Sequence, residues 1–277
     1  MNKDSVTRKL RNKAKELGLN YNLVLSKFFF DEFLKLLSNS VHRENFMLKG
    51  GMLLTYSLGV QNRATQDIDF LVKGFPLESA EMKKVLEEII GDNKQSDIWF
   101  ELNSTAEEIR AEDEYGGLRF HIIGHLANIR IPFSVDIATG DPIYPFPRVE
   151  KYSTILGDNI ELKMYPLESV LSEKLQTVLA RAENNSRSKD FYDIYILYHL
   201  KKEEIDFEHL KEACQNTFKH RYTDFNIDSI LNVLTGLKVE KDLKIRWSSY
   251  QKRFRYAEEI SFDEAVNAVI EVVKNIR

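Results

Sequence analysis

Hydrophobic and polar positions follow two different periods along the chain, and the change of period predicts its organisation. Apolar residues recur at helical spacing over residues 4–17 and 21–37, which predicts two helices, the second apolar enough to lie in the core. Between residues 44 and 166, short apolar runs bounded by turn residues predict strands, and two segments keep helical spacing. The expected strands are residues 46–48, 67–72, 97–102, 118–124, 132–138, 153–156 and 160–165, and the expected helices are residues 52–58 and 76–90.

The strand pattern ends at Pro166, and helical spacing alone follows it. The helices expected there are residues 167–181, 190–200, 206–218, 227–234, 242–255 and 262–276. Strands mixed with helices favour an α/β or α+β unit with a mixed sheet. We therefore predict a sheet domain over residues 1–165, which includes the two N-terminal helices, and a helical domain over residues 166–277.

The composition of the 277 residues narrows the class of protein. A hydrophobic fraction of 43%, a charged fraction of 30% and a net charge of −4 are typical of a globular protein and exclude a disordered chain or a polycation. The single cysteine, Cys214, excludes an internal disulfide and a cysteine-based metal site. A local basic groove stays compatible with this charge balance.

Targeting signals are also missing from the sequence pattern. No apolar run reaches the roughly 18 residues of a transmembrane helix, and the first 15 residues lack the apolar core of a signal peptide. The basic residues of that segment suit either a transit sequence or, as we favour, a solvated helix. We expect a cytoplasmic protein with no membrane partner.

Candidate chemistry begins at Asp67 and Asp69, two residues apart in an expected strand. Alternate residues of a strand share a face, so both carboxylates lie on one side, while Ile68 and Phe70 can enter the core. Adjacent carboxylates repel each other unless a cation compensates them, and Mg²⁺ prefers oxygen ligands of this kind. The pair is either a metal site or a solvated pair on an edge strand.

The segment Lys49-Gly50-Gly51 favours the metal site. Two glycines between a strand and a helix let backbone N–H groups approach a ligand, and the start of the following helix favours phosphate. Lys49 adds a positive charge beside them. The strand–helix–strand connection is short enough to bring the glycines and the carboxylate pair to one edge of a sheet.

A third carboxylate would complete a two-metal site for phosphoryl transfer. Asp136 is the candidate, because an acidic residue between Val135 and Ile137 in a strand needs a polar site or a cation. Asp141, within Gly140-Asp141-Pro142, is either a further ligand or, as we favour, a turn residue.

Several segments together resemble the AbiEii/AbiGii abortive-infection toxin family, a branch of the nucleotidyltransferase superfamily. In family order they are Leu48-Lys49-Gly50-Gly51, Arg63-x-Thr65-x-Asp67-Ile68-Asp69-Phe70, Val135-Asp136-Ile137 with Gly140-Asp141-Pro142, Glu173-Lys174-Leu175, and Arg187-Ser188-Lys189-Asp190-Phe191-Tyr192-Asp193. The resemblance spans about residues 26–198 and is weaker beyond. One departure is Gly50-Gly51, where the wider superfamily often has Gly-Ser.

The resemblance implies a nucleotidyltransferase-like α+β fold and an Mg²⁺-dependent enzyme, with Mn²⁺ as the alternative ion, whose substrate is a nucleoside triphosphate (ATP, GTP, CTP or UTP). The metal ligands that it implies are Asp67, Asp69 and Asp136, and the catalytic residues beside them are Lys174 and Asp193. The nucleotide-binding residues that it implies are Lys49, Gly50, Gly51, Arg63, Thr65, Lys189 and Asp190.

The same resemblance implies a biological role. It indicates the toxin of a type IV toxin–antitoxin pair, which acts in abortive infection and antiviral defence. The expected protein partner is a cognate antitoxin, of the winged-helix transcriptional regulator type.

The helical domain supports part of this residue set independently. Lys174 falls within the apolar stripe of residues 167–181, where a lysine must pair with a carboxylate, extend to the surface or line a cavity. Asp190 and Asp193 share a face of the next helix, so Asp193 can orient Lys174 or touch the substrate. A functional lysine and a structural ion pair both fit this pattern, and Asp190 is either a site residue or the cap of its helix.

Two further features each permit two interpretations. His121 and His125 lie four residues apart, and we take them as structural residues and not as metal ligands. Residues 241–256 interleave basic and aromatic side chains, as RNA-binding surfaces do. A solvated helix with an aromatic core side fits that segment equally well.

The sequence therefore favours an enzyme that transfers a nucleoside monophosphate from a nucleoside triphosphate to an acceptor, expected to be an RNA or tRNA 3′ end, and so inhibits growth or phage propagation. Two Mg²⁺ ions on the three aspartates would bridge the triphosphate. The alternatives are a phosphotransferase that modifies a protein hydroxyl and a non-catalytic module that binds nucleotide or antitoxin. The presence of all three carboxylates argues against the non-catalytic module.

Overall fold

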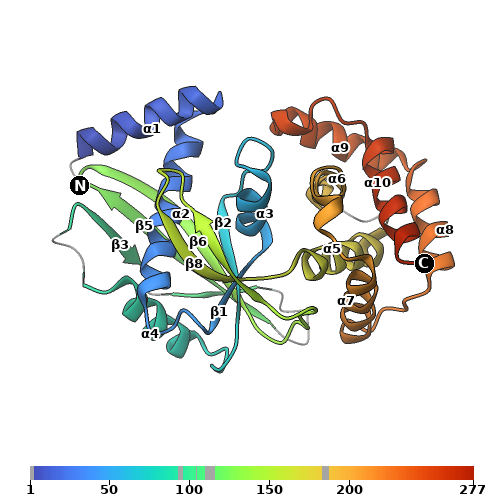
Figure 1. Ribbon diagram of the computed structural model, residues 1–277, viewed down its shortest axis with the longest axis horizontal. Coiled ribbons are helices and arrows are strands. Elements are labelled where there is room, and N and C mark those ends of the chain that lie inside the picture. The colour runs from blue at the N-terminus through green and yellow to red at the C-terminus, as the bar shows by residue number, and fades with distance from the viewer. Residues whose placement is uncertain (1–2, 93–95, 104, 110–115, 183–186) are drawn as a thin grey trace. The chain divides into compact units, whose positions relative to one another are not determined.

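The computed structural model describes residues 3–92, 96–103, 105–109, 116–182 and 187–277, which form two compact units (Figure 1). The first unit, Met1–Asp141 with Arg148–Met164, contains an eight-stranded mixed sheet. The second unit, Pro142–Pro147 with Tyr165–Arg277, is helical. The α+β class expected from the sequence is confirmed.

The first unit interleaves helices with strands. Its helices are α1 (Lys3–Leu17), α2 (Tyr21–Asn39), α3 (Gly50–Leu58) and α4 (Ser79–Ile90). Its strands are β1 (Phe46–Lys49), β2 (Asp67–Val72), β3 (Ile98–Leu102), β4 (Glu107–Ile109), β5 (Gly117–Leu126), β6 (Ile129–Ala138), β7 (Arg148–Ser153) and β8 (Asn159–Met164). The helical and extended segments expected from hydrophobic periodicity thus occur in the expected order.

The strands do not pair in chain order. The order across the sheet is β3-β5-β6-β2-β1-β8-β7. Strand β4 pairs with the first residues of β5. Strand β2 is antiparallel to β1 and parallel to β6, while β5 is antiparallel to β6. Segments far apart in sequence therefore meet at the middle of the sheet, at β6, β2 and β1.

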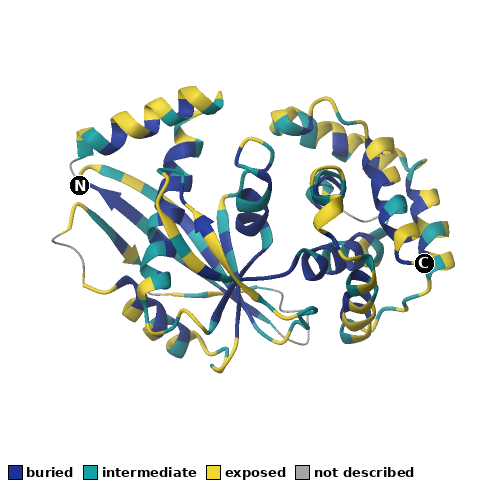
Figure 2. Cartoon of the chain, in the orientation of Figure 1, coloured by how far each residue is buried: buried dark blue, intermediate teal, exposed yellow. Residues whose placement is uncertain are grey.

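The core of this unit lies between the sheet and α2. Five aromatic rings of α2 and the sheet make edge-on or tilted contacts with centroid distances of 5.2–6.4 Å: Phe29, Phe30, Phe33, Phe100 and Phe133. Aromatic pairs in this geometry add to the burial of apolar area. Figure 2 shows the central strands as largely buried and α1 as buried on one face, where Val6 and Leu10 point inward.

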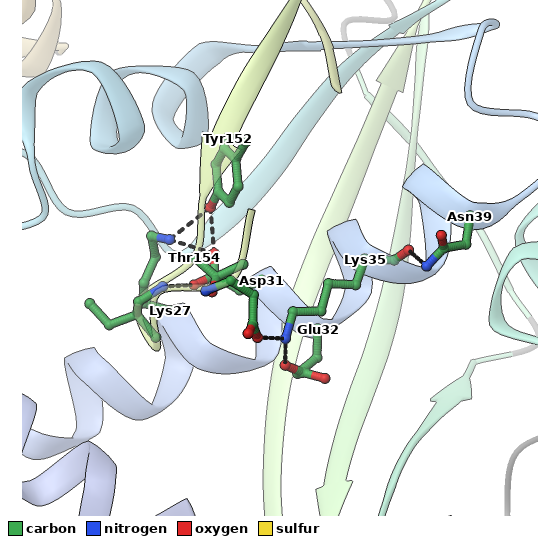
Figure 3. A network of polar contacts seen from close by, with 9 residues as sticks. Lys27, Asp31, Glu32, Lys35, Asn39, Tyr152 and Thr154 are labelled. Carbon is green, nitrogen blue, oxygen red and sulfur yellow. Dashed lines mark hydrogen bonds and ion pairs between the residues drawn. The ribbon is translucent and has the colours of Figure 1, made fainter. Parts of the chain in front are cut away.

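A buried polar network ties α2 to the β7–β8 hairpin (Figure 3). The side chain of Lys27 pairs with Asp31 and donates to the Tyr152 hydroxyl at 2.7 Å. Tyr152 in turn donates to Asp31, which also accepts the Ile155 N–H at 2.6 Å. Burial, with Asp31 beside it, raises the pKa of Tyr152, so the phenol stays neutral and remains a donor. Hydrophobic spacing alone gave no indication of this network.

The helical unit contains α5 (Leu167–Arg181), α6 (Ser188–Lys201), α7 (Phe207–His220), α8 (Ile227–Leu237), α9 (Lys241–Arg253) and α10 (Phe262–Asn275). Helix α5 packs against α6 and α7, and α10 packs against α6 and α8. Side-chain caps start three of the helices: Asp206 on α7, Asn226 on α8 and Ser261 on α10. Ser261 forms a capping box with Glu264, which satisfies backbone N–H groups that the helix itself cannot bond.

No helix among the described residues combines the length and the apolar character needed to cross a membrane.

Several local expectations differ from the structure, and three examples show how. The first strand of the last hairpin is Arg148–Ser153, and not 153–156, because Thr154 to Gly157 form the turn and the charged residues of this edge strand hide its alternation. Strand β4, three residues with two glutamates, was missed for the same reason. Helix α4 begins at Ser79 instead of Pro76.

Candidate active site

A row of four charged residues crosses the middle of the sheet. In the strand register Arg119 lies opposite Asp136, Asp136 opposite Asp69, and Asp69 opposite Lys49, on β5, β6, β2 and β1 respectively. Directly opposite residues of neighbouring strands point to the same face of a sheet. The row therefore runs cation, anion, anion, cation on one face.

Asp67 joins this row from the start of β2. It is two residues from Asp69 and shares its face, as the sequence predicted. Carboxylate oxygens of Asp67, Asp69 and Asp136 all lie within 4.8 Å of one another, and the three side chains are partly exposed. We call these three residues the acidic cluster. Three oxygen donors at this spacing, open to solvent, fit a hard divalent cation such as Mg²⁺.

Two carboxylates of the acidic cluster are held by neutral donors. The Thr65 hydroxyl donates to Asp67 Oδ1 at 2.6 Å, and the backbone N–H of Gly51 donates to Asp69 Oδ2 at 3.1 Å. The family resemblance implied that Thr65 and Gly51 are nucleotide contacts. The structure brings both to the acidic cluster, where they orient its carboxylates.

Gly50 and Gly51 are required by close packing. Gly50 has φ +58°, and a Cβ there would lie 2.7 Å from Asp69 Cβ and closer still to its carboxylate. A Cβ on Gly51 would lie 3.0 Å from Thr65 Cβ. Helix α3 begins at Gly50 itself, so the start of the helix touches the acidic cluster. The glycines thus let the backbone approach Asp69 and Thr65 directly.

Arg119 is the site residue that the sequence analysis missed. Its Nε and Nη2 donate to the two oxygens of Asp136, each at 2.7 Å, in a bidentate pair. These hydrogen bonds, and then the charges of Asp136, Asp67 and Asp69, raise the pKa of Arg119 despite partial burial, so it is always cationic. A signal existed: Arg119 is a charged residue between Leu118 and Phe120, as Asp136 lies between Val135 and Ile137.

Lys49 ends the row in a buried ion pair. Its Nζ lies 2.8 Å from Asp141 Oδ2, and both side chains are less than 10% exposed. Asp141 is therefore more than a turn residue, because it neutralises the lysine beside the acidic cluster. Arg63, also buried, donates to the carbonyl of Ala64 in the loop that leads to β2. Phosphate-binding roles for Lys49 and Arg63 stay predictions.

A second charged cluster lies within the helical unit. Lys174 of α5 contacts Asp190 Oδ1 at 3.1 Å and Asp193 Oδ2 at 2.6 Å, both on α6. We call these three residues the lysine cluster. The N-cap position of α6 is Arg187 and Asp190 lies in the first turn of the helix, so the interpretation of Asp190 as the helix cap is wrong. The Oδ2 atom of Asp190 is buried with no hydrogen-bond partner among the described residues.

The remaining candidates are Lys189, His121 and His125. Lys189 is half-buried in the first turn of α6. His125 stacks on Trp99 and contacts Glu101 at 3.1 Å, whereas His121 contacts Glu107 at 3.0 Å, so the two histidines have different partners.

The aromatic side of residues 241–256 faces inward. Trp247 is 2% exposed, donates to the carbonyl of Ile260 at 2.8 Å and packs against Tyr250 and Phe262. A buried indole cannot stack on a base. These contacts favour the interpretation of this segment as a solvated helix with an aromatic core side.

Comparison with known proteins gives one family. The model of the family described as "Nucleotidyl transferase AbiEii toxin, Type IV TA system" matches residues 32–268. The chain belongs to this AbiEii family. It is therefore a nucleotidyltransferase of a type IV toxin–antitoxin system, as the resemblance of its motifs implied.

Solved structures agree with the AbiEii fold. A candidate nucleotidyltransferase from H. pylori is similar with a TM-score of 0.51 and 12% identity, over 93% of this chain and 96% of that one. JHP933 from Helicobacter pylori is similar with a TM-score of 0.55 and 12% identity, over 93% of each chain. At such identity the likeness concerns the fold alone. No curated protein matches the sequence.

Proposed function

We propose that the acidic cluster is the metal site at which this AbiEii chain transfers a nucleoside monophosphate from a nucleoside triphosphate to the 3′ end of an RNA. The observation that supports it is the meeting of three carboxylates, from β2 and β6, within 4.8 Å on an open face of the sheet. Such a set needs cationic compensation, and its donors are the oxygens that Mg²⁺ or Mn²⁺ prefers.

Each residue of the site has a separate task in this proposal. Asp67, Asp69 and Asp136 hold the metal, while the Thr65 hydroxyl and the Gly51 N–H fix the first two carboxylates. When bound, Mg²⁺ supplies activation of the acceptor hydroxyl and stabilisation of the leaving pyrophosphate. Orientation by a neutral second layer of donors is typical of metal sites and holds the ligands in place.

The chemistry fixes where the atoms of the nucleotide go. The acceptor oxygen bonds to the α-phosphorus, the bond to the bridging oxygen breaks, and pyrophosphate leaves with the electron pair while the hydroxyl gives up its proton. The α-phosphate therefore stays on the acceptor. Transfer of the γ-phosphate to a protein hydroxyl would instead leave a nucleoside diphosphate.

The family supports part of the proposal about partners. The type IV toxin–antitoxin assignment implies a nucleotide substrate and an antitoxin. We extend this to a tRNA acceptor, whose extended 3′ end would be unusable in translation, and to a winged-helix regulator as antitoxin. Lys174 and Asp193, with Lys189 and Asp190, are proposed to act in the same reaction on the strength of the motif resemblance.

The test supplies total RNA, Mg²⁺ and each nucleoside triphosphate labelled at either the α- or the γ-phosphate. With wild-type protein we expect the α-label in RNA. In Asp69→Asn we expect the transfer activity to fall by more than the ~10–100-fold that is typical when an outer-layer metal partner is lost. Asp92→Asn, which changes an exposed carboxylate after α4, is the matched control and should retain full activity.

Two outcomes of this test would contradict the proposal. Label transferred to protein from the γ-position would indicate the phosphotransferase. Unchanged transfer by a folded Asp69→Asn variant would remove the acidic cluster from the mechanism.

A further inference from the structure

Arg119 already pairs with Asp136, one of the three carboxylates that are expected to bind the metal. The guanidinium and Asp136 form a planar, bidentate pair with two contacts of 2.7 Å, so both oxygens of Asp136 accept from the same cation. Asp67 and Asp69 differ in this respect, because the Thr65 hydroxyl and the Gly51 N–H that hold them are neutral. A neutral donor can remain in place when a cation arrives at the same carboxylate.

A charged donor that remains beside the metal is destabilised by electrostatic repulsion. A divalent ion on Asp136 would lie only a few ångströms from the guanidinium, and like charges at that distance repel even in a water-like dielectric. Arginine stays protonated in proteins, so the charge of Arg119 persists at every working pH. Deprotonation therefore offers no relief, and the repulsion must be relieved by movement.

The exposure of the two partners indicates which of them moves. The side chain of Arg119 is 35% exposed, whereas that of Asp136 is 12% exposed and extends from a central strand. The long arginine side chain can swing into solvent at little cost, while Asp136 stays beside Asp69 in the strand register.

We propose that Arg119 is a built-in counter-ion of the acidic cluster, which competes with the divalent metal for Asp136 and releases it when the metal binds. The inference rests on the proposed metal site. Without metal, the arginine compensates the carboxylates and keeps the sheet face intact. With metal, the same compensation comes from the ion.

The experiment measures Mn²⁺ binding to the full chain by electron paramagnetic resonance, without nucleotide. Arg119→Gln removes the competing charge and keeps a hydrogen-bonding side chain. We expect its Kd for Mn²⁺ to fall about tenfold, the scale expected when one cationic charge leaves the neighbourhood of a divalent ion. Arg119→Lys keeps the charge but loses the bidentate geometry, so its Kd should fall by a smaller factor.

Arg130→Gln is the matched control for net charge. Arg130 is exposed, lies on β6 with Asp136 and is separated from it by about 20 Å of strand, so its loss should leave the Kd of Mn²⁺ unchanged. Thermal melting of each variant verifies that the sheet unit is folded. If Arg119→Gln does not fold, Arg119→Lys provides the test, because its Kd for Mn²⁺ is also expected to fall.

The outcomes separate this inference from the proposed function. Tighter Mn²⁺ binding in Arg119→Gln but not in Arg130→Gln supports the competition. Unchanged or weaker binding in a folded Arg119 variant, beside normal binding by the wild type, overturns the competition and leaves the metal site standing. If the wild type itself binds no Mn²⁺, the proposed metal site fails and the competition with it.

Discussion

The acidic cluster and the lysine cluster both bring aspartates together, but they differ in solvent access and in charge balance. In the sheet unit, the three carboxylates of the acidic cluster are all partly exposed, and Arg119 pairs with one of them. In the helical unit, Lys174 lies between Asp190 and Asp193, whose side chains are 5% and 0% exposed. One cluster is open to an ion from solution, while the other is closed around its own lysine.

This difference shows that acidic spacing alone does not define a metal site. Asp67 and Asp69 are two apart on a strand, and Asp190 and Asp193 are three apart on a helix, so each pair shares a face. What separates them is the partner that the fold supplies. A buried pair must carry its compensating cation within the protein, whereas a partly exposed cluster can take one from solvent.

The largest expected effect tests the closed cluster. Lys174→Met removes the cation between two buried carboxylates, and one oxygen of Asp190 already lacks a hydrogen-bond partner among the described residues. We expect the free energy of unfolding of the helical unit to fall by about 3–5 kcal/mol, the usual cost of breaking a buried ion pair from one side. Denaturant titration followed by circular dichroism measures this change.

The control for that variant is Lys219→Met, on the exposed surface of α7 in the same unit. Its stability should stay within about 0.5 kcal/mol of the wild type. A Lys174→Met protein as stable as this control, but inactive in nucleotide transfer, would show that the lysine acts on the substrate and is not needed to balance the aspartates.

A smaller effect is expected from Gly50→Val, which tests the open cluster. The new side chain would push Asp69 away from the metal position, in addition to the strain of a positive φ. We expect Mn²⁺ affinity and nucleotide transfer to fall about a hundredfold, comparable to the upper range for a displaced metal partner.

Gly18→Val separates collision from backbone strain. Gly18 has φ +64°, close to the +58° of Gly50, but a Cβ there meets nothing within 4 Å. Both variants should lose stability through backbone strain, Gly50→Val more than Gly18→Val because it also collides with Asp69, and Gly50→Val alone should lose metal binding. Equal metal affinity in the two proteins would mean that Asp69 is not the ligand that Gly50 accommodates.

The smallest effect is expected from Thr65→Val. This change removes the hydroxyl that donates to Asp67 Oδ1 at 2.6 Å and keeps the branched shape. Loss of an outer-layer partner of this kind should raise the Kd for Mn²⁺ about tenfold, with little change in the thermal midpoint. Thr65→Ser restores a hydroxyl and should restore affinity. Failure of that rescue would assign Thr65 to packing against Gly51.

Hydrophobic periodicity predicted most of the fold, because it reports local geometry. The boundaries of β2 and α5 agree with the expected segments residue for residue. The errors fell where charge hides the alternation, as in the edge strand β7. The buried pair of Lys27 and Asp31 was missed for a different reason. Its partner Tyr152 is 121 residues from Asp31 along the chain, and local periodicity does not report such distant contacts.

Some features of the candidate site follow from local sequence, and others depend on tertiary structure. The sequence by itself determined that Asp67 and Asp69 share a face and that two glycines lie where a strand passes into a helix, because both follow from spacing along a short segment. The structure begins that helix, α3, at Gly50. Only the tertiary structure decided that Arg119 holds Asp136 and that Lys49 is neutralised by Asp141, which is 92 residues away. The pairing of β5 with β6 places Arg119 beside Asp136, and the segment that follows β6 places Asp141 beside Lys49 on β1. The neighbouring positions of β6, β2 and β1 depend on how the whole sheet buries its apolar face, which no local pattern encodes.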